Sequence, residues 1–171
     1  MVALDPANGS LKWRVKPAQA ARFEDVDAPI LTDESNVYVT TYAGATFALN
    51  REDGATIWKF DKGGVQGMAS GERLIFLASQ DRYLYGIDKT NGEAKWTFAC
   101  KRSGKLTRPV MIKGRIAIAC SYGHVHIIDP GDGHEEKTLY APGTINSPLS
   151  LIEGRLMAFT GKGYLVAFTY P

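Results

Sequence analysis

The chain of 171 residues is 44% hydrophobic and 22% charged, and it carries a formal net charge of +2. This composition is typical of a globular protein with a buried core and excludes an intrinsically disordered chain. The net charge is too small to indicate nucleic-acid binding, and no apolar run approaches the roughly 18 residues that a membrane-spanning helix needs.

The first predicted element is a turn within ALDPANGSLKW, residues 3–13, and three similar segments follow it. These are ALNREDGATIW at 48–58, GIDKTNGEAKW at 86–96 and IIDPGDGHEEK at 127–137. Each has an Asp or Asn four residues before a Gly. The first three segments end in a Trp, and the fourth has Lys137 at that position. An Asp or Asn side chain can bond the backbone two residues on, and Gly can adopt a positive φ, so a tight turn is expected in each.

The turns recur about every 40 residues, which indicates stacked supersecondary units. Between them lie runs of β-forming residues such as NVYVTT (36–41) and RLIFLAS (73–79), each followed by a polar or Gly-containing break and a second run such as ATFALN (45–50). A short strand precedes each set, and another follows the turn. No ten-residue segment shows a period of 3.6, so almost no helix is expected.

Four-stranded antiparallel units repeated in series predict an all-β fold, a β-propeller of about four blades that forms a single domain over residues 1–171. The expected blades are residues 28–60, 65–98, 107–140 and 147–171. The outer strand of the last blade is expected from residues 10–15 or from a neighbouring chain.

The repeated pattern A-x-D-x-x-(T/N/D)-G-x-x-x-W resembles the tryptophan-docking repeat of the quinoprotein-like, or PQQ-repeat, propellers. The resemblance implies that Trp13, Trp58 and Trp96 are structural clips, each packed against the neighbouring blade; a ligand-stacking role is the alternative. It also implies about eight blades to a ring, so that four blades make half of one.

The two ends of the chain do not match as a closed ring requires. MVALD at the start and LVAFT near the end occupy the same strand position in the repeat, so there is one inner-strand segment too many. This is expected of a chain cut from a longer propeller. The open blade edges favour self-association, with two chains forming an eight-bladed ring.

Several side-chain groups are candidates for chemistry. His124 and His126 lie on one face of a predicted strand and could hold zinc or copper with a third ligand. They occupy repeat positions filled elsewhere by Tyr and Phe, however, which favours a packing role. Cys100 and Cys120 each end an apolar strand-like run and are interpreted as buried small residues, with their pairing left open.

Other motifs favour structural interpretations. DKTNGE and DPGDG lack the spacing of an EF-hand calcium loop and are interpreted as turns. Ser121 lies in ACSYG, which resembles a nucleophile elbow, but a strand follows it where the elbow needs a helix. Lys101, Arg102, Lys105 and Arg108 form a basic loop, either solvated or in contact with anionic groups. No catalytic residue, metal site or cofactor is therefore expected.

The stretch RFEDVDAPI, residues 22–30, gathers three carboxylates, Glu24, Asp25 and Asp27, just before Pro29. In an extended stretch Asp25 and Asp27 project to the same side. They could meet a cationic patch on a partner, or they could form a turn solvated by water. No base, nucleophile or metal ligand set surrounds them in the sequence, so a catalytic role is not expected.

The order of GSLKW, RFEDVDAPI, SQDRYLYGID and LTRPVMIKGRI resembles the C-terminal half of the BamB family, periplasmic lipoproteins of the outer-membrane β-barrel assembly machinery. The resemblance implies a non-enzymatic scaffold whose Asp25 and Asp27, with Glu24 beside them, dock the periplasmic domains of the barrel subunit. It implies a periplasmic location at the outer membrane, although the sequence shows neither a signal-peptide pattern nor a lipidated Cys.

Two alternatives remain open at this stage. One is a quinoprotein-like ligand-binding or enzymatic domain. Quinone-dependent dehydrogenases of this superfamily carry adjacent cysteines and an acidic base with calcium ligands, and the sequence shows neither set. The other is a sensor module of a larger protein.

Overall fold

The computed structural model describes residues 1–16, 26, 28–42, 44–64, 66–100 and 104–169. Every regular element in these residues is a β-strand, which confirms the all-β prediction. None of the described segments forms a helix with the length and apolarity needed to cross a membrane.

The strands form five antiparallel sheets. The N-terminal hairpin consists of β1 (Val2–Leu4) and β2 (Leu11–Arg14). The first sheet consists of β3 (Leu31–Thr32), β4 (Asn36–Thr40), β5 (Thr46–Asn50) and β6 (Thr56–Phe60). The second consists of β7 (Met68–Ser70), β8 (Leu74–Ala78), β9 (Tyr83–Asp88) and β10 (Ala94–Ala99). The third consists of β11 (Val110–Ile112), β12 (Arg115–Cys120), β13 (His124–Ile128) and β14 (Glu135–Tyr140). The fourth consists of β15 (Ser150–Ile152), β16 (Arg155–Phe159) and β17 (Leu165–Phe168).

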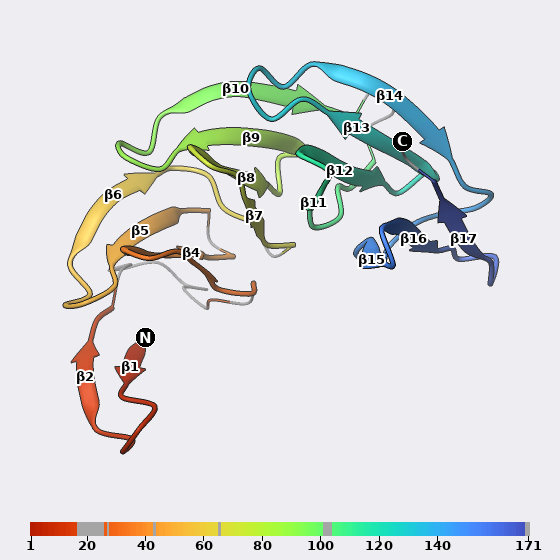
Figure 1. Cartoon of the computed structure of the whole chain (residues 1–171). Coiled ribbons are helices and arrows are strands. Elements are labelled where there is room, and N and C mark those ends of the chain that lie inside the picture. The colour runs from red at the N-terminus through yellow and green to blue at the C-terminus, as the bar shows by residue number, and fades with distance from the viewer. Residues whose placement is uncertain (17–25, 27, 43, 65, 101–103, 170–171) are drawn as a thin grey trace.

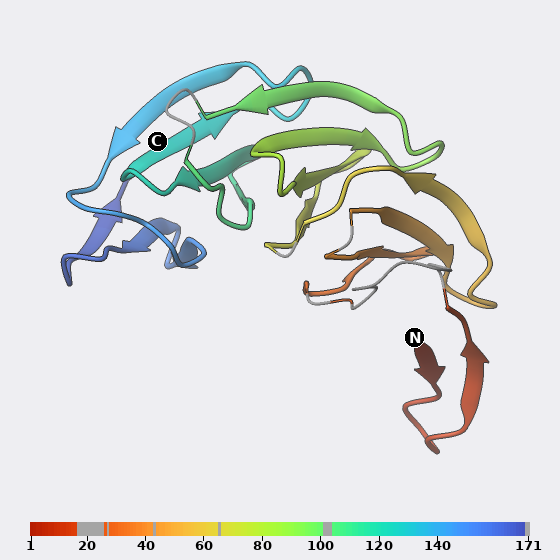
Figure 2. The ribbon, with the colours of Figure 1, turned by 180° about the vertical axis from the view of Figure 1, so that it is seen from behind.

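The sheets follow one another around an open arc, with the N-terminal hairpin at one end and the fourth sheet at the other (Figures 1 and 2). The last strands β10 and β14 lie along the outside of the arc, and the first strands β7 and β11 lie toward its inside (Figure 1). Because β2 pairs with β1, it does not complete the fourth sheet, which has three strands. Supply of a fourth strand by a neighbouring chain stays a prediction.

The repeated turns form as the sequence predicts. The backbone N–H of Gly92 donates to the carbonyl of Asp88 at 2.9 Å, and the Asp88 carboxylate accepts from the N–H of Thr90 at 2.9 Å. Gly92 has φ +75°. The same two hydrogen bonds and a positive φ recur in the turns that end at Gly9, Gly54 and Gly133.

The core is divided into layers, one between each pair of neighbouring sheets. Ile75 and Leu77 of β8 pack with Tyr38 of the first sheet, whereas Phe76 packs with Ile116 of the third. Further layers join the N-terminal hairpin to the first sheet and the third sheet to the fourth. The first, second and third sheets are therefore buried on both faces, and their middle strands, such as β8 and β12, are buried at successive positions.

The connections lie on two edges of the arc. The "turn face" carries the repeated turns and the short links 33–35, 71–73, 113–114 and 153–154. The "loop face" carries the opposite hairpin ends and the sheet-to-sheet connections, described at residues 41–42, 44–45, 61–64, 66–67, 79–82, 100, 104–109, 121–123, 141–149 and 160–164. Backbone hydrogen bonds join neighbouring sheets along the loop face, for example from Gln80 to Gly63 at 3.1 Å and from Gly161 to Thr144 at 2.8 Å.

Candidate functional site

Three tryptophans join the N-terminal hairpin to the first sheet, the first sheet to the second and the second to the third at the turn face. The indole N–H of Trp58, on β6, donates to the carbonyl of Lys89 in the second sheet at 2.8 Å. Trp96 donates in the same way to Pro130 at 3.0 Å, and Trp13 donates to Arg51 at 3.0 Å. Each indole is at most 9% exposed.

Each of these indoles also stacks on a turn glycine of the next sheet. A Cβ added at Gly92 would lie 2.7 Å from the ring of Trp58, and one added at Gly133 would lie 2.5 Å from the ring of Trp96. Only glycine therefore allows this close approach. The Asp-Gly-Trp repeat thus has a physical reason: the Gly of one turn receives the Trp of the preceding sheet.

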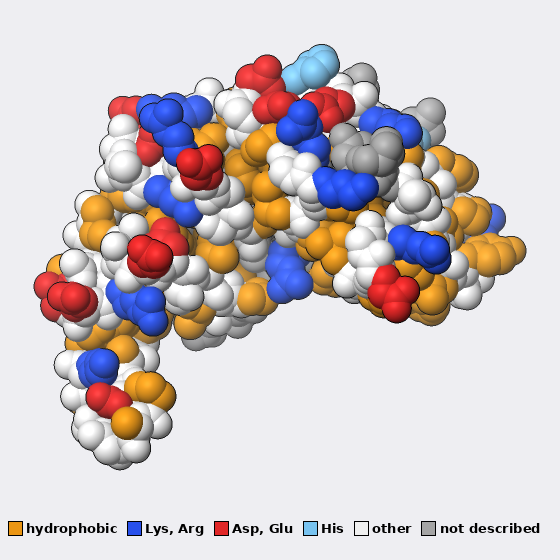
Figure 3. Space-filling view, in the orientation of Figure 1, with side chains coloured by type: hydrophobic (Ala, Val, Ile, Leu, Met, Phe, Trp, Pro, Cys, Tyr) orange, Lys and Arg blue, Asp and Glu red, His pale blue; other side chains and the backbone are white. Residues whose placement is uncertain are grey.

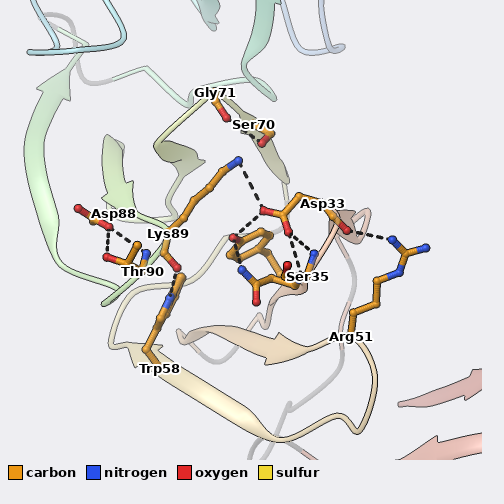
Figure 4. A network of polar contacts seen from close by, with 11 residues as sticks. Asp33, Ser35, Arg51, Trp58, Ser70, Gly71, Asp88, Lys89 and Thr90 are labelled. Atoms are coloured by element: carbon orange, nitrogen blue, oxygen red, sulfur yellow. Dashed lines mark hydrogen bonds and ion pairs between the residues drawn. The ribbon is translucent and has the colours of Figure 1, made fainter.

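A polar network reinforces the contact between the first and second sheets (Figure 4). The Lys89 ammonium lies 3.5 Å from the Asp33 carboxylate, while the Lys89 carbonyl accepts from Trp58. The hydroxyl of Tyr38 donates to the Asp33 carboxylate at 2.9 Å. The Arg51 guanidinium donates to the backbone carbonyl of Asp33 at 3.2 Å. Lys89 therefore binds the first sheet through both its backbone and its side chain.

The network shifts the pKa values of its acids. Partial burial raises the pKa of the Asp33 carboxyl, but hydrogen bonds from Asn36, Tyr38 and Ser35 and the charge of Lys89 lower it more, so the pKa lies below its ordinary value. Burial, together with the Asp33 charge, raises the pKa of Tyr38 to about 12. Asp33 is thus ionised and Tyr38 neutral throughout the physiological pH range.

The loop face carries a second polar cluster. The hydroxyl of Tyr85 donates to the Asp81 carboxylate at 2.7 Å, and the Lys62 ammonium lies 3.1 Å from it. Burial raises the pKa of Asp81, but the hydrogen bonds from Tyr85, Lys62 and Ser79 outweigh it and leave the pKa below its ordinary value. Ser79 also donates to the carbonyl of Gly63 at 2.9 Å, which ties the second sheet to the connection before it.

Beside this cluster the loop face is hollowed by a pocket of about 220 Å³ between the first, second and third sheets. Its lining residues are Tyr42, Gln66, Ala78, Ser79, Gln80, Arg82, Lys105 and Leu106. The charged groups in this set, Arg82 and Lys105, are both cationic, and the ring of Tyr42 is 49% exposed. The pocket therefore suits an anionic or aromatic group of a binding partner.

Glu24, Asp25 and Asp27, the predicted partner-binding residues, lie outside the described residues, and so do Lys101 and Arg102 of the basic loop. Val26 packs partly buried against the layer that contains Trp13, and Ala28 is 7% exposed.

The other predicted candidates occupy the third sheet. Ser121 accepts a hydrogen bond from the N–H of Lys105 at 3.0 Å, and strand β13 follows it, as the sequence predicts. The His124 and His126 rings stack with their centroids 6.2 Å apart. His126 is 5% exposed and packs against Phe98 of the second sheet, with ring centroids 5.1 Å apart.

Two features of the third sheet were not predicted. Cys100 and Cys120 form a disulfide that joins the end of β10 to the end of β12, where the sequence left their pairing open. Glu135 lies 2.6 Å from Nδ1 of His126. The separation of 20 residues between the two cysteines gives no sign of the disulfide, which depends on how the second and third sheets stack. The contact between His126 and Glu135 lies within the third sheet, between the paired strands β13 and β14.

A larger pocket, of about 420 Å³, lies at the turn face between the second and third sheets. Its lining includes Arg73, Asp88 and Lys95, and Lys95 forms ion pairs with Asp88 at 3.7 Å and with Glu93 at 3.0 Å. These exposed pairs neutralise one another. None of the lining residues is a histidine, cysteine or serine.

Comparison with known proteins gives consistent matches. The family model described as "Outer membrane protein assembly factor BamB" matches residues 1–170. Relatives with that description include one from Xanthomonas campestris pv. campestris, 28% identical over 149 residues, which are 86% of this chain and 36% of the relative. Another, from Salmonella typhimurium, is 26% identical over 170 residues, 94% of this chain and 43% of the relative. The chain thus spans less than half the length of these curated relatives.

Solved structures share the fold. BamB from Moraxella catarrhalis superposes with a TM-score of 0.80 at 18% identity, over 94% of this chain and 50% of that one. The computationally designed Ika4 protein superposes with a TM-score of 0.77 at 11% identity, over 94% of this chain and 98% of that one. A quinohemoprotein alcohol dehydrogenase from Comamonas testosteroni superposes with a TM-score of 0.65 at 14% identity, over 80% of this chain and 29% of that one. At these identities the structures share a fold, and nothing about chemistry follows.

Proposed function

Because this chain belongs to the family of the outer membrane protein assembly factor BamB, we propose that it is a non-enzymatic scaffold that docks the periplasmic domains of a β-barrel assembly subunit. The observation that carries the proposal is the family match over residues 1–170, which includes the acidic stretch. Its site of action is then the periplasmic side of the outer membrane.

We assign the docking surface to the loop face, with Glu24, Asp25 and Asp27 as its acidic contacts. In an extended stretch Asp25 and Asp27 project to the same side. Two acids on one side can meet a cationic surface, where each charge-assisted hydrogen bond contributes about 1.5–3 kcal/mol once water is excluded.

The pocket between Tyr42, Arg82 and Lys105 adds a second contact of opposite charge on the same face. A partner that presents a cation to the acidic stretch and an anion or an aromatic ring to the pocket would be held in one orientation. The likeness to quinohemoprotein dehydrogenases supports a shared fold and does not favour an enzymatic function.

The test is a titration of the chain against the isolated periplasmic domains of a barrel-assembly subunit. Replacing Asp25→Lys and Asp27→Lys together should weaken binding by several kcal/mol, and added salt should weaken the wild-type complex. The matched control is Glu34→Lys with Glu52→Lys, which makes the same charge change at exposed sites on the turn face. Equal affinity for both double variants would contradict the proposal.

We further propose that two copies of the chain associate end to end into an eight-bladed ring. Among the residues that the structure describes, β17 pairs with β16 alone and β1 pairs with β2 alone, so each end of the arc presents an open strand edge. Large apolar side chains are exposed at both ends, including Val2 and Leu4 at one end and Phe159 and Leu165 at the other. Figure 3 shows hydrophobic surface at the end that carries the fourth sheet.

Light scattering tests the association. A mass of twice 18.7 kDa at high concentration is expected, because each open edge gains a strand partner and each exposed apolar face gains a cover. A mass of one chain at every concentration would contradict it.

A further inference from the structure

Between the second and third sheets, three metal-ligating side chains converge on one point. Sγ of Cys100, Sγ of Cys120 and a ring nitrogen of His126 all lie within 4.8 Å of one another. They come from the end of β10, the end of β12 and the middle of β13, so the packing of two sheets brings them together. In this structure the two sulfurs form a disulfide.

His126 is oriented as a metal ligand. Its Nδ1 lies 2.6 Å from the Glu135 carboxylate, which also accepts a hydrogen bond from Thr138. Its Nε2 is buried and has no hydrogen-bond partner among the residues that the structure describes. A carboxylate that holds the Nδ1 proton leaves the Nε2 lone pair available, as in the carboxylate–histidine pairs of zinc sites. A buried nitrogen without a partner carries a free-energy cost that a bound cation would remove.

We propose that, once the disulfide is reduced, Cys100, Cys120 and His126 bind one Zn²⁺ ion per chain. Two thiolates neutralise the dication, which suits a site where Cys120 is fully buried. Ideal Zn–S and Zn–N bonds place tetrahedral ligand atoms about 3.5–3.8 Å apart, within the span observed here. Cys100 is only partly buried, so the ion and a water as fourth ligand can enter beside it.

A dithiol serves as the reductant of the Cys100–Cys120 disulfide. The dithiol donates two electrons and two protons: the Cys100–Cys120 bond breaks, two thiols form, and the dithiol closes its own disulfide. Zn²⁺ then displaces one proton from each thiol and accepts the lone pair of His126 Nε2, so two protons are released for each ion bound. Disulfide and zinc are alternative ways of joining the same two sheets.

The experiment uses the whole chain, reduced with a dithiol and desalted without oxygen, with Zn²⁺ measured by competition against a chromophoric chelator and Co²⁺ as a spectroscopic probe. One equivalent of Zn²⁺ should bind with release of two protons, and Co²⁺ should give thiolate-to-metal charge-transfer bands and the visible bands of a tetrahedral site. The oxidised chain should bind neither ion.

Variants separate this site from adventitious binding. His126→Phe should fold, because the neighbouring sheet carries Tyr85 at that position, and it should lose the tetrahedral Co²⁺ spectrum. Cys120→Ser should lose the charge-transfer bands. Glu135→Gln should retain the spectrum with a 10–100-fold weaker affinity, since it acts only through His126. His124→Ala, on the same strand, is the control and should bind like the wild type.

Several results would overturn the proposal. One is the absence of stoichiometric Zn²⁺ binding by the reduced wild type. Another is an unchanged Co²⁺ spectrum in His126→Phe. A third is loss of the ion in His124→Ala while its circular dichroism matches the wild type. This proposal uses none of the residues assigned to docking, so either proposal can fail alone.

Discussion

The third and fourth sheets have the same register but very different burial. Arg115 pairs with Ile112 in the third sheet, and Arg155 pairs with Ile152 in the fourth. Four residues after each arginine, strand β12 carries Ala119, which is fully buried, and strand β16 carries Phe159, which is 58% exposed. The larger apolar side chain thus lies at the more exposed of two equivalent positions.

The difference shows where the stability of this architecture arises. Ala119 packs against the fourth sheet, whereas no further sheet among the described strands covers Phe159. A repeat unit of this kind cannot bury both of its faces alone, and its stability comes mainly from the layers between units. Substitutions in a layer should therefore cost several kcal/mol, and substitutions on the uncovered face of β16 should cost almost nothing.

The largest effect is expected for Trp96→Ala. This change empties a buried site between the second and third sheets and removes the hydrogen bond to Pro130. The free energy of unfolding should fall by about 3–5 kcal/mol, as for other buried Trp truncations. Urea unfolding measures it, and Trp96→Phe, which keeps an aromatic ring, should cost less. A loss below 1 kcal/mol for Trp96→Ala would mean that the layers do not carry the stability.

Removing the disulfide should have the next largest effect. Cys100 and Cys120 are 20 residues apart and join the second sheet to the third. Replacing both with Ala should lower the free energy of unfolding by about 2–4 kcal/mol, mainly because the unfolded chain gains freedom. Urea unfolding of the double variant beside the oxidised wild type is the measurement. An unchanged midpoint would show that the disulfide adds nothing to the packing of this layer.

The sequence predicts the repeat far better than the contacts between repeats. Spacing alone identifies the turns ending at Gly54, Gly92 and Gly133, because Asx hydrogen bonding and positive φ are local. The role of these glycines in receiving Trp13, Trp58 and Trp96 is not local and was not predicted; the resemblance to the tryptophan-docking repeat implied only that each Trp packs against the neighbouring blade.

The side-chain groups between sheets are harder to predict. Cys100, Cys120, His126 and Glu135 come from different strands, and the periodicity of each strand says only that their positions are buried. The offset between the second and third sheets decides whether Cys100 meets Cys120 and His126. Glu135 reaches His126 from the next strand of the same sheet, so this contact depends instead on the register between β13 and β14, which shifts between Ile127 and Ile128.

A smaller, pH-dependent effect is expected for Asp33→Asn, in the network between the first and second sheets. Loss of the ionised hydrogen-bond acceptor should cost about 1–2 kcal/mol at neutral pH. The pKa of Asp33 is lowered in the folded state, so its contribution is fully present above the unfolded pKa of about 3.9 and is lost as the pH falls through the lower folded pKa.

Thermal or urea unfolding from pH 7 down to pH 2 checks this expectation. The difference in stability between wild type and Asp33→Asn should shrink below about pH 4. Glu34→Gln, at an exposed neighbouring site, is the control and should show no such change. A difference that stays constant with pH would show that the carboxylate charge is not what stabilises the network.

The smallest effect on the single chain is expected for Phe159→Ser. The ring is 58% exposed, and surface substitutions usually change stability by within about 0.5 kcal/mol. At low concentration the variant should therefore unfold like the wild type. Association changes this expectation, because a partner that binds only the folded chain raises the apparent stability as concentration rises. The melting temperature of the wild type should rise with protein concentration and that of Phe159→Ser should not. Parallel concentration dependence in both proteins would place the association surface elsewhere than the uncovered face of β16.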